Sequence, residues 1–301
     1  MRERSRPPAF RTHREAWHWA ESELPNLAPA LRQAPTVGDD VLAWKLPVTV
    51  LVIFELLGHV ADIIPVLRSA LTVSRKLGDR AAEAWVQASL AEAYQDVGRP
   101  DEAIECCRGA LAISAGTSDW HSQWLAWHLE GTAYLCLGRF GEAVDCIQQA
   151  LATARQASDI RTEGMSLTWL GAVHERLGSF DTAISLREQA VAALKQARNR
   201  WQYAYALQKL AEACHHHGRA VDAIGNYQQA QAIFRQIGDR RTEADTLLQL
   251  GHAQRTAGRA DAARQSWQQA LAIFDELRDP RADQVRTQLR TEAPTRTSRT
   301  G

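Results

Sequence analysis

Hydrophobic and polar positions along the chain repeat with a fixed period of 40 residues. Glycine recurs once per copy, and an acidic or amide residue closes each copy. Alanine follows the glycine at two positions, except that the first copy has Ile63 at the first of them. The glycines are Gly58, Gly98, Gly138, Gly178, Gly218 and Gly258, and the closing residues are Asp79, Asp119, Asp159, Asn199, Asp239 and Asp279. A fixed period is typical of architectures in which each copy buries its apolar face against its neighbours. We therefore expect six repeats, 41–80 through 241–280, which together span 41–280.

The spacing within one copy predicts two helices. Asp79 is a helix N-cap residue, and apolar residues at helical spacing between 90 and 97 continue to Gly98. Gly98 supplies the positive φ at which the first helix ends, and Pro100 suits the first turn of a second helix. A second amphipathic run, with small alanines that allow close helix packing, covers residues 103–113. Each copy is therefore predicted to be a helix–turn–helix hairpin that stacks on the next.

These residues resemble the tetratricopeptide repeat. Its pattern of a large apolar residue, Leu-Gly, and two later alanines is found as Leu167, Leu170-Gly171, Ala183 and Ala190. The usual repeat is shorter and ends at a proline, whereas Ala115, Arg155, Lys195 and Arg235 occupy that position here. The second helix is therefore expected to be longer, as in the long repeats of cell-polarity adaptors and large bacterial signalling regulators. The resemblance implies an all-α fold, a right-handed α-solenoid of stacked hairpins.

The remaining segments complete the predicted organisation. We expect a disordered basic arm at 1–12, capping helices or a degenerate repeat at 13–40, a capping helix at 281–292 and a disordered tail at 293–301. The stretch Trp19–Leu27, followed by Ala30-Leu31, resembles a linker in actinobacterial signal-transducing ATPases, including the antibiotic regulatory proteins. In that family the linker joins a nucleotide-binding module to C-terminal repeats. The alternative is an amphipathic capping hairpin without that relationship.

Composition excludes several classes of function. The 35 basic and 35 acidic residues balance, which argues against specific nucleic-acid binding. No GxxxxGK[ST] phosphate loop and no nucleophile–base–oxyanion pattern occur, so we predict a non-enzyme without a cofactor. The longest apolar run, 46–57, is too short to cross a bilayer and contains Glu55. Five cysteines without a CxxC pair indicate reduced thiols, and hence a cytoplasmic protein.

The repeat frame also predicts a binding surface, because the first helices of such repeats line a concave groove. Aromatic, histidine and charged side chains of both signs are expected there, which suits a protein or peptide segment. The predicted groove residues are Trp85, Glu92, His128, Thr132, Trp169, Glu175, Tyr205, Gln208, Lys209, Glu212, His216, Gln249, His252 and Arg255. The alternative is a varied, merely solvent-facing surface. Paired asparagines that clamp peptide backbones in relatives with the long repeat are replaced here, for example by Thr168-Trp169.

His215, His216 and His217 are the one candidate metal cluster. Three consecutive helical side chains point in divergent directions, so no metal site is predicted. Imidazolium groups at a helix C-terminus interact favourably with its dipole.

The sequence thus predicts a non-catalytic protein- or peptide-binding scaffold or sensor in bacterial regulation. A receptor for a small signalling molecule near His128, Trp169 and Lys209 is one alternative. The detached sensor half of a transcription-regulating ATPase system is another. Homo-oligomerisation is left open.

Overall fold

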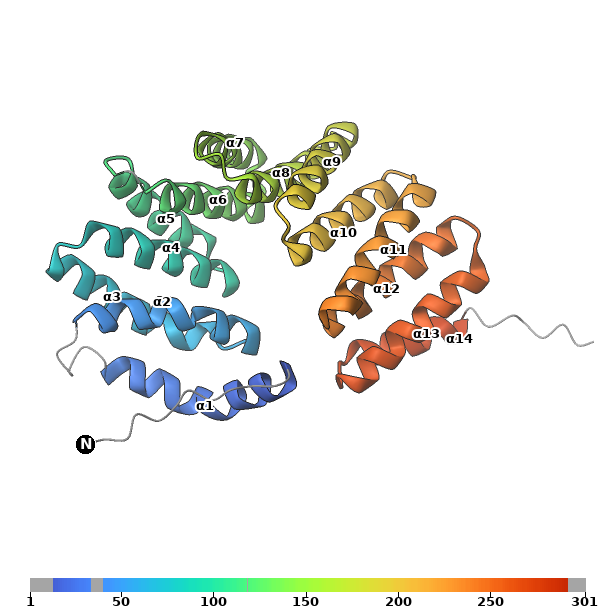
Figure 1. Cartoon of the computed structure of the whole chain (residues 1–301), viewed down its shortest axis with the longest axis horizontal. Helices are drawn as coiled ribbons and strands as arrows, with labels where there is room; N and C mark the ends of the chain where they lie inside the picture. Colours follow the sequence, from blue (N-terminus) through green and yellow to red (C-terminus); the bar gives the residue numbers. More distant parts are fainter. Residues whose placement is uncertain (1–12, 34–39, 118, 292–301) are drawn as a thin grey trace, which may run out of the picture. The chain divides into compact units, whose positions relative to one another are not determined.

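The computed structural model describes residues 13–33, 40–117 and 119–291. The predicted arm at 1–12 and tail at 293–301 lie outside these residues, as does residue 292 of the predicted capping segment. Within the described ranges the chain forms α-helices and no strands, so the predicted all-α class is confirmed (Figure 1). The helices are α1 His13–Gln33, α2 Asp40–Leu57, α3 Val60–Leu77, α4 Arg80–Asp96, α5 Pro100–Ser114, α6 Trp120–Cys136, α7 Phe140–Gln156, α8 Ile160–Arg176, α9 Phe180–Gln196, α10 Arg200–His216, α11 Ala220–Ile237, α12 Arg240–Thr256, α13 Ala260–Glu276 and α14 Arg281–Thr291.

The residues that close each copy cap the helix that follows. From Asp79 to Asp239, each side chain accepts a hydrogen bond from the backbone N–H three residues on, at 2.8–3.1 Å. Asp279 caps α14 in a related way through the N–H of Arg281, at 3.0 Å. The six recurring glycines all adopt a left-handed conformation, with φ between 73° and 78°. The local turn chemistry predicted from the sequence is therefore confirmed.

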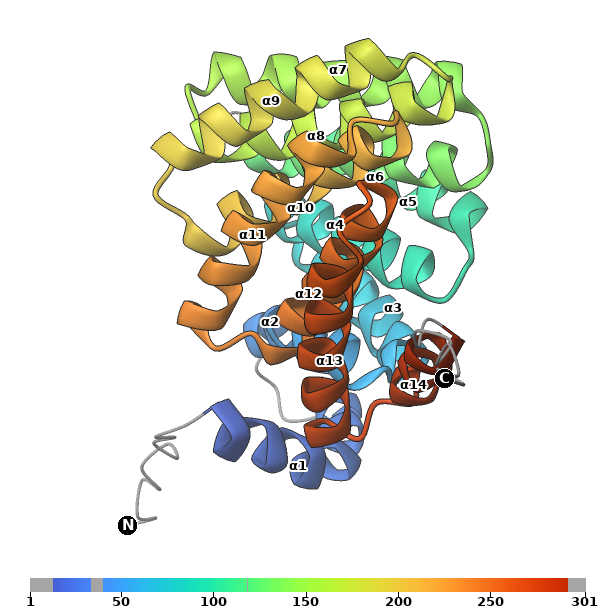
Figure 2. The ribbon, with the colours of Figure 1, turned by 90° about the vertical axis from the view of Figure 1, so that its right-hand side faces the viewer.

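The chain divides into two compact units, Met1–Thr153 and Ala154–Gly301, and the boundary lies within α7. In the first unit each helix from α2 to α5 packs against the next one along the chain, and α1 packs against α2 and α3. In the second unit the same succession runs from α8 to α14 (Figure 2). Each hairpin therefore stacks on its neighbour within its unit, which is the solenoid packing that the period predicted.

Glycines in the first helix of a hairpin let large side chains of the second helix approach its backbone. A Cβ atom on Gly171 would lie 2.8 Å from Cγ of Arg187, and one on Gly251 would lie 2.2 Å from Nε1 of Trp267. The indole of Trp267 is fully buried and donates to the carbonyl of Leu248 at 3.2 Å. The Leu-Gly pair of the repeat thus creates the space in which Arg187 lies.

Candidate functional site

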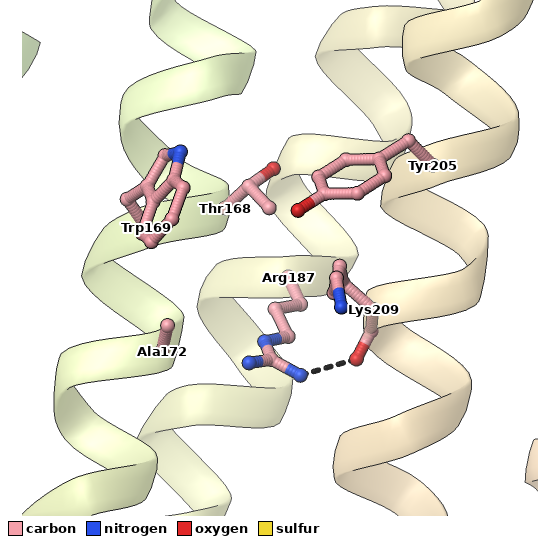
Figure 3. A pocket seen from close by; sticks show the side chains of 6 residues that line it. All are labelled: Thr168, Trp169, Ala172, Arg187, Tyr205 and Lys209. Carbon is pink, nitrogen blue, oxygen red and sulfur yellow. Dashed lines mark hydrogen bonds between the residues drawn. The ribbon is translucent and has the colours of Figure 1, made fainter. Parts of the chain in front are cut away.

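A hollow of about 140 Å³ opens on the second unit (Figure 3). Helix α8 contributes Thr168, Trp169 and Ala172, α9 contributes Arg187, and α10 contributes Tyr205 and Lys209. Three predicted groove residues, Trp169, Tyr205 and Lys209, are therefore brought together at one place. The volume is close to that of a cavity of roughly 150 Å³ that holds one benzene molecule. The hollow consequently has room for about one small ring or one side chain.

Arg187 lies beneath the hollow as a buried cation. Its side chain is only 4% exposed, and its guanidinium donates to Oε2 of Glu175 at 2.7 Å and to the carbonyl oxygen of Lys209. Among the described residues, its Nε atom has no hydrogen-bond partner. A buried guanidinium requires a carboxylate nearby, because an uncompensated charge in the interior is strongly destabilising. Glu175 therefore fixes the position of Arg187.

Glu175 connects three helices of the second unit. One carboxylate oxygen accepts from Arg187 of α9, and the other lies 2.8 Å from Nδ1 of His216 on α10. Glu175 and His216 were both predicted to line the groove. Neither belongs to the lining of the hollow, and both instead form the network that supports Arg187.

Tyr205 has aromatic and cationic neighbours. Its ring stacks on Trp201 with centroids 5.4 Å apart, and Nζ of Lys209 lies 5.3 Å from its centroid. Lys209 also donates to both carboxylate oxygens of Glu212, at 2.9 and 3.1 Å. The Tyr205 hydroxyl has no protein partner in the part of the chain that is described, and Figure 3 shows it pointing into the space toward Thr168. This hydroxyl can therefore bind a group that enters the hollow.

The polar groups of the hollow are mostly hydrogen-bond donors. Arg187 is paired with Glu175, and Lys209 is paired with Glu212, so both positive charges are compensated. The Thr168 hydroxyl is occupied by its own bond to a backbone carbonyl, at 2.9 Å. The hollow is thus electrically balanced and rich in donors.

The predicted groove residues of the first unit interact with neighbouring side chains of the same unit. An aromatic ladder runs from Trp85 through His121 and Trp124 to His128, with centroid separations of 5.5, 5.6 and 5.2 Å. His128 is buried, and desolvation lowers its pKa to about 4. Thr132 is buried as well and donates to the Gln95 side chain at 2.8 Å. His128 and Thr132 therefore present little surface to a ligand.

Glu92, the fourth predicted residue of that unit, belongs to a carboxylate cluster with Glu55 and Asp96. Burial raises the pKa of Glu92, and Asp96 raises it further. Burial, Glu92 and Asp96 together raise the pKa of Glu55 to about 7. One oxygen of Glu55 is buried and has no hydrogen-bond partner in the described part of the chain.

The four remaining predicted residues of the second unit lie outside the hollow, on α10 and α12. Gln208 is buried, and Gln249, His252 and Arg255 stand on α12, one repeat further along. His252 packs against Trp267, with centroids 5.5 Å apart. None of these four side chains is part of the lining.

The three consecutive histidines diverge, as the sequence predicted. His215 bonds to Thr256 of α12 at 3.0 Å, His216 reaches Glu175, and His217 lies 3.5 Å from Asp181 of α9. Within the described residues no group of three or more potential ligands is arranged to hold a metal ion. Each histidine thus contacts a different helix.

Sequence reasoning missed Arg187, which lies on a second helix, whereas the groove was assigned to first helices. One signal could have found it. The spacing from Gly171 to Arg187 is the same as the spacing from Gly251 to Trp267, so a large side chain facing this glycine recurs in the repeat frame.

The family model of the tetratricopeptide repeat matches residues 80–156, 162–236 and 202–276. The chain belongs to the tetratricopeptide repeat family. Its long copies therefore follow the family pattern through more than half of the sequence. No curated protein matches this member of the family. None of its described helices is both long enough and apolar enough to cross a bilayer.

Solved structures extend the likeness beyond the matched repeats. BtubC (BKLC) from P. vanneervenii is 19% identical, with 77% of this chain and 92% of that chain covered and a TM-score of 0.61. A Rap protein complexed with Competence and Sporulation Factor is 14% identical, with 92% and 80% covered and a TM-score of 0.62. A signal transduction ATPase with a tetratricopeptide repeat sensor, from Pyrococcus horikoshii, is 16% identical, with 94% and 53% covered and a TM-score of 0.54. At these identities the likeness shows the repeat fold alone.

Proposed function

We propose that this repeat protein is a non-catalytic scaffold or sensor that binds a segment of a partner protein. The face formed by α8 and α10 in the second unit is the binding surface. The observation that carries the proposal is the hollow between Trp169 and Tyr205, with its unpartnered hydroxyl. Aromatic side chains around a small pocket are the usual anchors of protein interfaces.

The size of the hollow favours a protein segment over a free small molecule. Pockets for small ligands commonly measure about 300–1,000 Å³, whereas this one measures about 140 Å³. A space of that size holds one anchoring side chain, and further contacts along the chain would supply the remaining affinity. The family's use of repeats as protein-binding modules agrees with this choice.

A regulatory role in a bacterium is the finer part of the proposal. The linker-like stretch at 19–27 supports it, as does the likeness to a chain in which such repeats form the sensor of a signal transduction ATPase. A Rap protein of similar fold is complexed with Competence and Sporulation Factor. A detached sensor of this kind would act through a partner that carries the ATPase.

The proposal is tested by affinity capture of proteins from a bacterial lysate with three forms of the full chain. The wild type is compared with Trp169→Ser, which opens one wall of the hollow, and with Val221→Ser. Val221 is 64% exposed on α11 and does not line the hollow, so it provides a matched loss of apolar surface. We expect a protein captured by the wild type and by Val221→Ser to be lost with Trp169→Ser. Equal capture by all three forms contradicts the assignment of this face.

A further inference from the structure

The chemistry of the hollow restricts what can enter it. A basic side chain is disfavoured because Arg187 and Lys209 already line the space. An acidic side chain would have to approach two cations that Glu175 and Glu212 already hold, and it would face repulsion from both carboxylates. An uncharged group leaves both ion pairs intact.

The hydrogen-bonding groups select further among uncharged groups. The Tyr205 hydroxyl is free to donate, and Lys209 has one N–H beyond the two that Glu212 accepts. The hydroxyl of Thr168 already donates to the carbonyl of Gly164. A segment that presents backbone carbonyl acceptors to the hollow matches the two available donors.

Proline matches this lining. It has a compact apolar ring of the size that a hollow of about 140 Å³ admits, and the carbonyl before it remains an acceptor. Proline-rich segments in the polyproline II conformation dock on aromatic surfaces, and their preformed backbone reduces the entropy lost on binding. Trp169 of α8 and Tyr205 of α10 line the hollow (Figure 3), and the exposed Trp201 stacks on Tyr205.

We infer that the hollow binds a proline ring of a partner segment in the polyproline II conformation. The Tyr205 hydroxyl donates to a backbone carbonyl of that segment, and Trp169 packs against the ring. The inference rests on the proposed function and names the class of partner that the same site selects.

The test is selection from a random library of twelve-residue peptides displayed on phage, panned on the full chain. The wild type, Trp169→Ser, Tyr205→Phe and Val221→Ser are used as separate targets, after circular dichroism has established that each is folded. We expect wild type and Val221→Ser to enrich peptides with proline at a fixed position, and Trp169→Ser to lose that enrichment. Synthetic peptides from the wild-type pool should bind Tyr205→Phe about three- to tenfold more weakly, the loss expected for one neutral hydrogen bond.

Two other outcomes separate this inference from the proposed function. Enrichment that needs Trp169 but selects acidic or other non-proline residues overturns the proline inference and leaves the binding face intact. Enrichment that is the same for wild type and Trp169→Ser, or no enrichment at all, overturns both. Tyr205→Phe removes a single oxygen, so it keeps the test valid even if the Trp169 variant fails to fold.

Discussion

Oε2 of Glu175 lies 2.7 Å from Nη2 of Arg187, and the two side chains join α8 to α9 beneath the hollow. Arg187 is 4% exposed, and Glu175 is the carboxylate that holds its guanidinium. A pair in this position contributes mainly by preventing an uncompensated buried charge, since the desolvation of both groups offsets much of their attraction.

Removing one partner should therefore cost more than removing both. Glu175→Ala is expected to lower the free energy of unfolding by about 3 kcal/mol, because it leaves Arg187 buried and unpaired. Urea denaturation followed by circular dichroism measures the loss. Asp222→Ala, which breaks an exposed pair with Arg219, should cost much less, because solvent screens that pair. A double variant, Glu175→Leu with Arg187→Met, should recover part of the stability, and a double variant as unstable as Glu175→Ala contradicts this account.

The carboxylate cluster of the first unit predicts a dependence of stability on pH. Glu55 has a pKa of about 7 in the folded chain, above the ordinary value of 4.5, because burial, Glu92 and Asp96 disfavour its charge. Folding therefore favours the protonated form, so the stabilisation is complete below the ordinary pKa and is lost as pH rises through about 7.

We expect the melting temperature of the wild type to fall between pH 5 and pH 8 more than that of Glu55→Gln. The glutamine cannot ionise, so the difference between the two profiles isolates this carboxylate from the histidines elsewhere. Thermal denaturation across that pH range measures both profiles. Parallel curves would show that Glu55 titrates as an ordinary surface carboxylate.

Left-handed backbone at a non-glycine residue predicts a stabilising substitution. Arg198 follows the end of α9 with φ of 55°, at the position that Gly238 occupies after α11. The left-handed conformation costs a residue with a Cβ about 1–2 kcal/mol, and the greater flexibility of unfolded glycine offsets part of the gain. Arg198→Gly should therefore raise the free energy of unfolding by about 0.5 kcal/mol. Lys195→Gly, inside the same helix, serves as the control and should lower it by about 1 kcal/mol.

Two glycines in helices should respond to alanine with opposite signs. A Cβ on Gly171 would lie 3.1 Å from the carbonyl oxygen of Ala183 as well as against Arg187, so Gly171→Ala should destabilise by about 1–3 kcal/mol. Gly225 is exposed within α11 and has nothing within 4 Å of that position. Gly225→Ala should stabilise by about 1 kcal/mol through helix propensity. Chemical denaturation of the two variants side by side decides whether packing or propensity controls each site.

The sequence was sufficient for features that depend on local backbone chemistry. The Asp79 and Asn199 caps and the left-handed Gly98 turn follow from side-chain reach and backbone sterics, and both act over a single helical turn. The same period placed Trp169 and Lys209 on one face, because residues one period apart occupy equivalent places on successive first helices.

The burial of individual side chains was not predictable in this way, because it depends on the sizes of the residues packed against them. His128 and Gln208 hold equivalent positions in their repeats, and both are buried rather than open to a groove. Periodicity gives the direction in which a side chain points. Periodicity does not show whether side chains of the next helix cover that side chain. The burial of Arg187 was not predictable for the same reason, because it depends on the absence of a Cβ at Gly171.

The junction between copies has a consequence for the length of such a chain. From Asp79 to Asp239, every first helix begins with the same cap, and from Gly58 to Gly258 each such helix ends at the same left-handed glycine. Deletion of one full period, for example residues 201–240, would place the sequence that normally follows the Asp239 cap directly after the Asn199 cap. No new turn would have to form. Duplication of the same stretch would preserve every junction equally well. The number of copies is therefore the property that this architecture can change with least disturbance to its turns.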